Sequence, residues 1–292
     1  MSEIMQQPQV VFIVSSAFSG STWLSFVLGS HPRAATLGEH WRRFRGKRDS
    51  ECRTCQHKGL AQCEILHGIT GVPLQEAYAM PLRRFASQGV DTLIDNSKQL
   101  DWLDELLAIG ACDSLSVRII HLIRDPRGWI ASSMGRSPEH EVGHLLSDWK
   151  QAVIDQQARL AALGLPVLRV SYDVACLDSD RVLEDLSAFV GIRYGLGSLR
   201  YWERVHHAMA GNGAAISVVP GAKGASWDRD YYLDRLGQVF HDDRWRRRLD
   251  PAQVRLVVDD PEAARLMREF GAGFERIDEL ARARDAADGE SP

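Results

Sequence analysis

The fold is decided by the stretch Val10-Val11-Phe12-Ile13-Val14-Ser15-Ser16-Ala17-Phe18-Ser19-Gly20-Ser21-Thr22-Trp23. The apolar, β-branched run predicts a buried strand over 10–14, and apolar residues then recur at helical spacing over 21–29. A strand that passes through a small-residue turn into a helix is suited to phosphate binding, because free N–H groups and the positive end of the helix dipole meet there. The same residues would also suit a plain turn in which Ser and Thr cap the helix.

Two common nucleotide-binding loops are absent from the sequence. Neither G-x-x-x-x-G-K-[ST] nor G-x-G-x-x-G occurs in it. We therefore expect the loop to bind a phosphate-containing ligand, and we do not expect ATP held in the manner of the P-loop ATPases. Gly20 would let the backbone approach the phosphate closely, and Ser19, Ser21 and Thr22 would add hydroxyl donors.

A second anion site is predicted about a hundred residues further on, in His121-Leu122-Ile123-Arg124-Asp125-Pro126-Arg127. Pro126 cannot continue a strand, so Arg124 is expected at the carboxyl end of the strand over 117–123. Ligands bind at that edge of open α/β sheets. Ser132 follows Arg124 by about two helical turns and can point back at the same anion.

Strands and helices alternate along most of the chain. Further strands are expected at 92–95 and 167–170, and helices at 148–163 and 179–190. This alternation predicts an α/β fold in which a parallel β-sheet has helices on both faces, with irregular loops beyond Arg204. We expect a single domain over 1–283, with a cysteine-containing insertion at about 49–68 and a flexible tail over 284–292.

Composition excludes several classes of protein. With 45% hydrophobic and 25% charged residues, the 292-residue chain is unlike a disordered or low-complexity protein. The 35 Lys and Arg against 39 Asp and Glu give a net charge of −4, which argues against a nucleic-acid binder with a wholly basic surface. A local basic pocket is still compatible with this balance. Small and polar residues interrupt the apolar stretch 10–28, so we expect no membrane span and a cytoplasmic protein.

Three of the five cysteines, Cys52, Cys55 and Cys63, lie close together, near His57 and His67. In a reducing compartment, C-x-x-C with a third cysteine is typical of a zinc site more than of a disulfide. A histidine could supply the fourth ligand. Because a second C-x-x-C pair is absent, a local disulfide and unligated thiols are alternatives.

Ser19-Gly20-Ser21-Thr22-Trp23, followed by Arg124 and Ser132, resembles the sulfotransferases that use 3'-phosphoadenosine 5'-phosphosulfate (PAPS), in particular bacterial ones. The first stretch resembles their 5'-phosphosulfate loop, and the Arg–Ser pair their 3'-phosphate site. Val170-Ser171-Tyr172-Asp173 is similar to the segment whose tyrosine lies near the adenine, and 206–212 to the Gly-Asn loop of bacterial members. The similarity covers about 10–249 and implies a P-loop nucleotide-binding-like fold.

The resemblance implies a cofactor role for each matching residue. PAPS, or its product adenosine 3',5'-bisphosphate, would contact Ser19, Gly20, Ser21, Thr22, Trp23, Arg124, Ser132, Tyr172, Gly211 and Asn212. Trp23 would stack on the adenine, although the residue type also suits a core aromatic. Lys223 lies on a Gly-rich loop and is expected to form a lid over the 3'-phosphate, together with the arginines of 244–248.

The resemblance also implies catalytic residues. Glu39 matches a glutamate that several members use as general base, a role that we expect to benefit from a pKa raised by partial burial. His40 is the alternative base. Many members carry Lys or Arg directly before the Ser-Gly of the loop, where this chain has Phe18. Lys98, in Asp-Asn-Ser-Lys, is similar to a family lysine near the transferred group and could replace that cation. A helix-capping or salt-bridged carboxylate is the alternative for Glu39. A surface lysine at a strand end is the alternative for Lys98.

These residues together imply in-line sulfuryl transfer from PAPS to a hydroxyl acceptor, such as a natural product, a glycan or a lipid, with no nucleic-acid partner. A small-molecule phosphotransferase is an alternative, but it would need the loop lysine that is missing. A catalytically silent binding module is another, and Phe18 favours it. The basic segment 41–48 is expected on the acceptor side.

Overall fold

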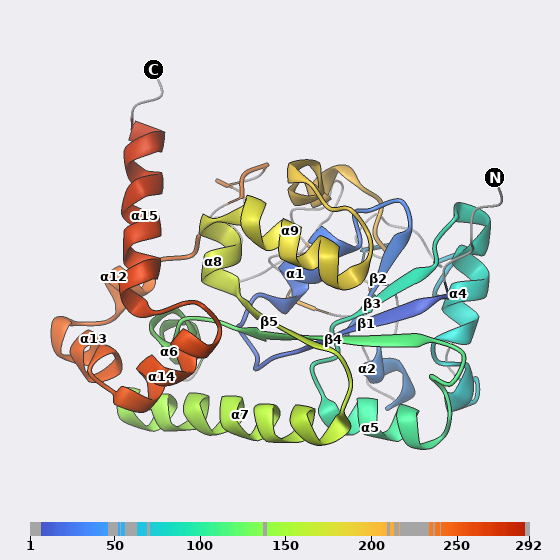
Figure 1. The fold of residues 1–292 in the computed structure, drawn as a ribbon, viewed down its shortest axis with the longest axis horizontal. Coiled ribbons are helices and arrows are strands. Elements are labelled where there is room, and N and C mark those ends of the chain that lie inside the picture. Colours follow the sequence, from blue (N-terminus) through green and yellow to red (C-terminus); the bar gives the residue numbers. More distant parts are fainter. Residues whose placement is uncertain are drawn as a thin grey trace. The chain divides into compact units, whose positions relative to one another are not determined.

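The protein is a parallel α/β structure, as the alternating pattern predicts. The computed structural model describes residues 7–45, 52, 54–55, 63–68, 71–136, 139–208, 211–212, 216, 234–235, 237–239 and 241–289. Within these residues the five strands form one sheet in the order β2-β3-β1-β4-β5 (Figure 1). The strands are β1 (Gln9–Val14), β2 (Ala34–Gly38), β3 (Thr92–Asp95), β4 (Ser116–Ile123) and β5 (Val167–Ser171).

The chain divides into two compact units. The first comprises Met1–Val14, Ser21–Ile120 and Val190–Val239, and the second comprises Ser15–Gly20, His121–Phe189 and Phe240–Pro292. Strand β4 therefore begins in the first unit and ends in the second, and the loop after β1 belongs to the second unit as far as Gly20. The single domain expected over 1–283 stays a prediction.

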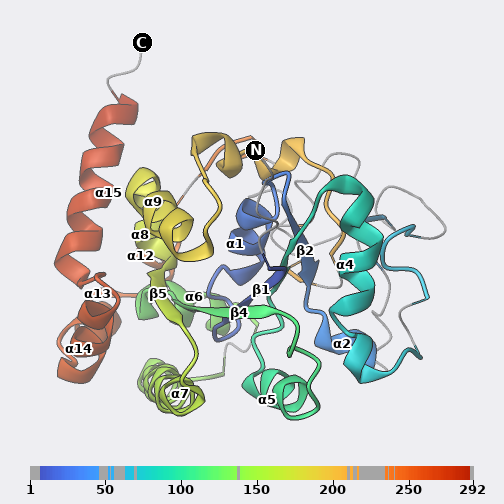
Figure 2. The same cartoon turned by 45° about the vertical axis from the view of Figure 1, so that its right-hand side comes forward.

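The first unit contains β1, β2 and β3, whose residues are all buried. Both β1 and β2 pair in parallel with β3, and a register shift between Thr36 and Gly38 sets Gly38 opposite Asp95. Helix α1 (Ser21–Leu28) lies on one face of these strands and α5 (Leu100–Ala108) on the other (Figures 1 and 2). The other helices among the described residues of this unit are α2 (Trp41–Phe44), α4 (Ala79–Phe85) and the 3-10 turns η1 (Leu74–Glu76), η2 (Ala86–Gln88), η3 (Leu196–Leu199) and η4 (Tyr201–Glu203).

The second unit contains the end of β4, β5 and most of the later helices. They are α6 (Pro126–Met134), α7 (Val142–Leu163), α8 (Tyr172–Leu177), α9 (Ser179–Val190), α12 (Trp245–Arg248), α13 (Pro251–Val258), α14 (Pro261–Glu269) and α15 (Phe274–Gly289). Helix α7 packs against α6, α13 and α14, and α15 packs against α8. Helix α15 includes the first residues of the expected flexible tail. None of the described helices has the length and apolar character needed to cross a membrane.

Candidate active site

The two predicted catalytic residues of the first unit lie in contact. Glu39 directly follows β2 and Lys98 follows β3, and these neighbouring parallel strands end at the same edge of the sheet. Lys98 Nζ donates to Glu39 Oε1 at 2.5 Å, and the two side chains are only 15% and 10% exposed. The contact places a carboxylate and an ammonium group together at the edge where α/β sheets bind ligands.

The turn that carries Lys98 is held rigidly. The buried Asp95 carboxylate accepts hydrogen bonds from Tyr78 Oη (2.8 Å), Trp102 Nε1 (3.2 Å) and the backbone N–H of Ser97 (2.7 Å). Lys98 itself has φ +68°, which is uncommon for a residue with a side chain. Such backbone geometry persists only where the surroundings enforce it, and it is concentrated at functional sites.

The electrostatics of Glu39 differ from expectation. Burial raises the pKa of its carboxyl, but the charge of Lys98 and hydrogen bonds from Lys98 and Arg42 outweigh burial, so the pKa is lowered. The expected rise of the pKa is therefore wrong, because these two cations compensate for the loss of solvent. Glu39 is ionised at neutral pH and can accept a proton.

His40 is less suited to the role of base than Glu39. Its side chain is fully buried, and Nε2 donates to the carbonyl of Ala77 at 2.8 Å. The rings of Phe44, Tyr78 and Trp102 surround the imidazole, and burial lowers its pKa. The other ring nitrogen, Nδ1, is buried without a partner among the described residues. His40 thus has the environment of a core residue.

The N-terminus of α1 meets the predicted Gly-Asn loop within the first unit. The backbone N–H of Asn212 donates to Thr22 Oγ1 at 3.1 Å. A Cβ on Gly211, whose φ is +140°, would lie 3.1 Å from the Thr22 methyl group, so a larger residue would strain this contact. Ser21 and Thr22 are buried, and Trp23 is half-buried. Four of the predicted cofactor residues, Ser21, Thr22, Gly211 and Asn212, therefore belong to neighbouring segments.

In the second unit, Arg124 connects the other predicted anion-binding residues. It follows β4, and Nη1 donates to Ser132 Oγ (3.2 Å) and to the carbonyl of Phe18 (3.1 Å). Its guanidinium also lies 5.2 Å from the centre of the Tyr172 ring. A Cβ on Gly128 would come within 2.8 Å of Arg124 Nε, so glycine leaves space for this arginine. The predicted Arg–Ser pair thus lies in hydrogen-bonding contact, and its role as an anion site stays a prediction.

Gly20 has a packing role that the sequence did not indicate. Its φ is +84°, and a Cβ there would lie 2.2 Å from Cδ2 of Tyr172. Any side chain at this position would therefore collide with the tyrosine ring. Phe18, two residues earlier, also has a positive φ of +64°. The loop conformation thus depends on close contact with Tyr172, which follows β5.

The other terminal nitrogen of the Arg124 guanidinium binds an acidic residue. Arg124 Nη2 donates to Asp242 Oδ2 at 3.0 Å, and Arg244 donates to both oxygens of the same carboxylate. Burial raises the pKa of Asp242, but the two guanidinium groups lower it far below its usual range. Arg244 and Arg124 thus share one carboxylate, and the expected role of Arg244 over the cofactor phosphates stays a prediction. Lys223, the predicted lid residue, lies outside the described residues.

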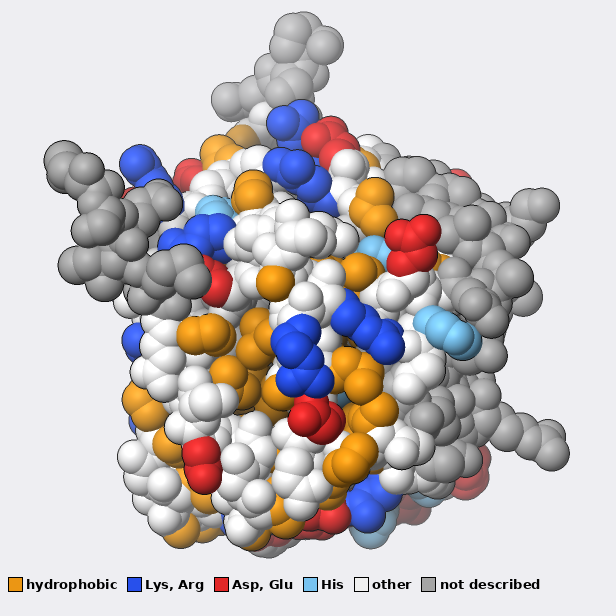
Figure 3. Space-filling model, turned by 90° about the vertical axis from the view of Figure 1, so that its right-hand side faces the viewer, with side chains coloured by type: hydrophobic (Ala, Val, Ile, Leu, Met, Phe, Trp, Pro, Cys, Tyr) orange, Lys and Arg blue, Asp and Glu red, His pale blue; other side chains and the backbone are white. Residues whose placement is uncertain are grey.

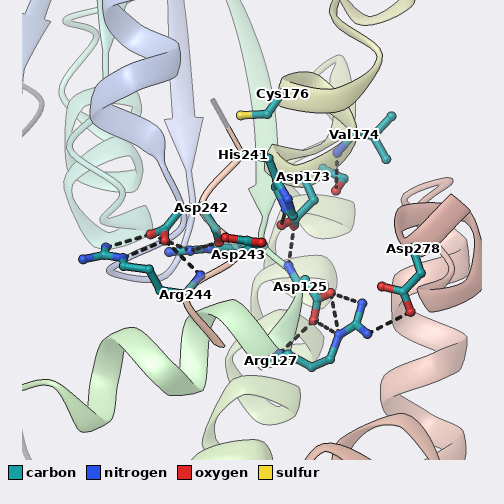
Figure 4. A network of polar contacts seen from close by, with 12 residues as sticks. Asp125, Arg127, Asp173, Val174, Cys176, His241, Asp242, Asp243, Arg244 and Asp278 are labelled. Carbon is teal, nitrogen blue, oxygen red and sulfur yellow. Dashed lines mark hydrogen bonds and ion pairs between the residues drawn. The ribbon is translucent and has the colours of Figure 1, made fainter. Parts of the chain in front are cut away.

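A polar network fixes the start of α6 (Figure 4). Asp125 caps the helix by accepting from the backbone N–H of Arg127 (2.8 Å), and its carboxylate also binds the Arg127 guanidinium. Arg127 Nη1 donates to Asp278 of α15 at 3.1 Å. The Asp173 carboxylate accepts from the backbone N–H of Asp125 and from Nε2 of His241. Arg127 is 2% exposed and therefore positions α6, and with it Arg124, instead of meeting a ligand.

The basic segment 41–48 is largely neutralised where it is described. Arg42 pairs with Glu39, Arg45 pairs with Glu105, and Arg43 is buried with Nη1 on the carbonyl of Leu66. The face drawn in Figure 3 shows Lys and Arg side chains interspersed with acidic and apolar ones, with no continuous basic surface in its described part. An acceptor-side role for this segment stays a prediction.

The three clustered cysteines lie together in the first unit. The histidine beside them is His207, which is distant in sequence. Ligand atoms of Cys52, Cys55, Cys63 and His207 all lie within 4.8 Å of one another. Among the described residues, His67 lies in the turn after Cys63 and does not belong to this group. The other nearby histidine, His57, lies outside the described residues. Sequence spacing could not indicate His207, because it is 144 residues away from Cys63.

A parallel α/β fold with Arg124 and Ser132 at one strand end and a Glu–Lys pair at another defines a candidate group-transfer enzyme. The model of the "Sulfotransferase family" matches residues 8–195, which is well over half of the chain, so the chain belongs to the sulfotransferase family. No curated protein matches it significantly in sequence.

Among the solved structures with a similar fold are two sulfotransferase domains. One is the "Sulfotransferase Domain from the Curacin Biosynthetic Pathway", with 17% identity and a TM-score of 0.59, covering 91% of this chain and 98% of that one. The other is the "Sulfotransferase Domain from the Synechococcus PCC 7002 Olefin Synthase", with 20% identity and a TM-score of 0.57, covering 94% and 98%. At these identities the likeness extends to the fold alone.

Proposed function

We propose that this protein is an enzyme that transfers the sulfuryl group of PAPS to the hydroxyl group of a small-molecule, glycan or lipid acceptor. The observation that carries the proposal is the Arg124–Ser132 pair, held at 3.2 Å in a chain that belongs to the sulfotransferase family. PAPS would supply an activated sulfuryl group and leave as adenosine 3',5'-bisphosphate.

The residues around Arg124 fit a phosphate group. A guanidinium binds oxyanions through paired N–H donors, and Arg124 already holds the Asp242 carboxylate on Nη2. Ser132 adds a hydroxyl that Arg124 orients. We assign the 3'-phosphate to this pair, the 5'-phosphate side to Ser19, Gly20, Ser21 and Thr22, and the adenine to Trp23 and Tyr172. Gly211, Asn212 and Lys223 complete the proposed cofactor set.

Glu39 and Lys98 are the proposed catalytic residues. The ionised Glu39 carboxylate would take the proton of the acceptor hydroxyl, which makes its oxygen a better nucleophile. Lys98 orients this carboxylate through its hydrogen bond, and its ammonium group adds positive charge that stabilises charge developing in the transition state. The lowered pKa of Glu39 keeps the base ionised in the cytoplasm, where we expect the enzyme to act.

Titration calorimetry with adenosine 3',5'-bisphosphate and with adenosine 5'-monophosphate tests the nucleotide site. The intact protein should bind the bisphosphate more tightly than the monophosphate. Arg124→Ala should abolish most of this difference in affinity. A loss of about tenfold or more is expected, because hydrogen bonds to charged groups contribute roughly 1.5–3 kcal/mol. Arg255→Ala, an exposed arginine of α13, is the matched control. An unchanged preference in Arg124→Ala, or binding of ATP with Mg²⁺ alone, would contradict the proposal.

Glu39→Gln separates catalysis from binding. The amide cannot take a proton, so transfer from PAPS to an acceptor should fall by roughly 10²-fold or more, the usual contribution of general base catalysis. Bisphosphate affinity should stay unchanged. Release of bisphosphate during incubation with a panel of hydroxyl acceptors is the measurement. Binding without any transfer in the unmodified protein would favour the silent binding module instead.

A further inference from the structure

The cysteine cluster brings three chain segments together inside the first unit. Cys63 Sγ lies 3.2 Å and Cys55 Sγ 3.5 Å from Nδ1 of His207. The three cysteines are nearly inaccessible to solvent, with exposures of 2%, 5% and 6%. Neither Glu39 nor the proposed nucleotide residues use these side chains. Three thiols and an imidazole therefore converge at a buried point with no part in the proposed transfer.

Each of the three segments is held in place by contacts of its own. Thr54 Oγ1 donates to the carbonyl of His206 at 2.6 Å and accepts from the backbone N–H of Ala208 at 3.4 Å, which joins the C-x-x-C segment to the segment of His207. The Phe85 ring packs edge-on against the His207 imidazole with their centres 5.9 Å apart. These contacts fix the histidine beside the thiols independently of any ligand.

The turn that carries Cys63 is anchored in the same manner. Arg43 Nη1 donates to the carbonyl of Leu66 at 2.8 Å, and Arg84 Nη1 donates to the carbonyl of Ile65 at 2.7 Å. The backbone N–H of Leu66 in turn donates to Cys63 Sγ at 3.2 Å. An N–H group directed at a sulfur stabilises a thiolate, which is the form that binds metal ions.

We propose that Cys52, Cys55, Cys63 and His207 bind one structural Zn²⁺ ion in tetrahedral coordination. Three thiolates and one imidazole form a common set for structural zinc, with no position left open for water or substrate. With Zn–S bonds of about 2.3 Å, tetrahedral sulfur atoms lie roughly 3.8 Å apart. Ligand atoms within 4.8 Å of one another need only small shifts to reach that arrangement.

The charge balance favours the same assignment. Binding releases the protons of the three thiols, so the divalent ion and three thiolates leave a single negative charge. The Leu66 N–H at Cys63 partly compensates this charge. A disulfide between two of the cysteines would leave the third thiol and His207 without a function. Soft sulfur ligands in tetrahedral geometry also exclude Mg²⁺ and Ca²⁺, which prefer oxygen.

Metal analysis of the full-length protein, purified without chelator or affinity-tag metals, tests the proposal. We expect one zinc ion per chain, and its loss in Cys63→Ser and His207→Ala. Cys112→Ser is the matched control, since Cys112 is a buried cysteine of the same unit outside the cluster. Co²⁺ substitution of the unmodified protein should give the strong visible bands of tetrahedral coordination and a sulfur charge-transfer band. This measurement does not depend on whether the variants fold.

Three outcomes would overturn the zinc assignment. They are protein that lacks zinc and takes up no Co²⁺, protein with iron in place of zinc, and protein with a Cys52–Cys55 disulfide found by mass spectrometry of alkylated samples. Failure of the bisphosphate binding experiment would leave the zinc proposal unaffected, because the two rest on different residues.

Discussion

Phe18 is the residue at which this chain departs most clearly from the sulfotransferases that it resembles. The side chain cannot donate a hydrogen bond to a leaving phosphate, but its ring lies 5.1 Å from the guanidinium of Arg136. A cation over the face of an aromatic ring is attracted to the ring's negative potential. The loop therefore has a positive charge beside position 18, although it comes from a residue beyond the end of α6.

Arg136 is expected to strengthen binding on the 5'-phosphate side of the nucleotide. Arg136→Ala should weaken binding of adenosine 3',5'-bisphosphate by about tenfold and leave binding of adenosine 3'-monophosphate unchanged, because one charge-assisted hydrogen bond is worth roughly 1.5–3 kcal/mol. Arg136→Lys retains the charge and should lose less. Equal losses for both nucleotides in Arg136→Ala would show a general structural effect instead.

Proximity of predicted site residues follows from the sequence where neighbouring strands end at the same edge of the sheet, and the roles of these residues stay predictions. Glu39 and Lys98 were predicted separately and prove to be in contact, since β2 and β3 are paired. The sequence does not predict that Asp242 pairs with Arg124, or that His207 is the fourth residue of the cysteine cluster. In both cases the contact joins segments over a hundred residues apart, with no periodic pattern to relate them.

At the scale of secondary structure, strong apolar runs gave the best predictions. The strand over 92–95 and the helix over 179–190 have the predicted bounds, and β1, β4 and β5 differ from prediction by one residue at an end. Strand β2 has no strong sequence signal, because Ala34-Ala35-Thr36-Leu37-Gly38 contains a single β-branched residue and consists mostly of alanine and glycine, which are depleted in strands. It is nevertheless fully buried beside β3, so tertiary pairing determines its structure.

The sequence pattern predicts neither α13 nor α14, although capping residues mark where each helix begins. Each starts with an aspartate followed by proline: Asp250 caps α13 and Asp260 caps α14. The aspartate side chain accepts from the first free N–H groups, and proline suits the first helical position because it needs no hydrogen bond there. The chain is therefore helical over 251–258 and 261–269, within the stretch beyond Arg204 for which the sequence pattern indicates irregular loops.

At the scale of the whole molecule, buried positive charges are paired with carboxylates. The net charge of −4 is small, and buried arginines such as Arg127 and Arg244 each bind a carboxylate. Stability should therefore depend on pH through groups whose pKa the folded protein shifts, whether by burial or by neighbouring cations. The carboxyls of Glu39 and Asp242 have lowered pKa values, so their contribution is present above the ordinary carboxyl range and is lost only in more acidic solution.

His121 should lower the stability of the protein in less acidic solution than these carboxyl groups do. It is fully buried in β4, with Nε2 3.0 Å from Gln156 Oε1 and its ring against Phe270. Burial lowers its pKa from 6.5 to about 4. Between these values the unfolded chain binds a proton that the folded chain does not, so stability falls as pH falls through this range. The full loss is about 3 kcal/mol, at roughly 1.4 kcal/mol per pKa unit.

Urea unfolding followed across this pH range tests the contribution of His121. The unmodified protein should lose stability steadily on acidification, and His121→Gln should remove about 3 kcal/mol of that loss, whatever its stability at neutral pH. The slope that remains belongs to other buried histidines, among them His40, whose pKa burial also lowers. His140→Gln, at an exposed position, should keep the slope of the unmodified protein. If His121→Gln retained the full slope, the imidazole would be taking up its proton in the folded state, and burial would not govern its pKa.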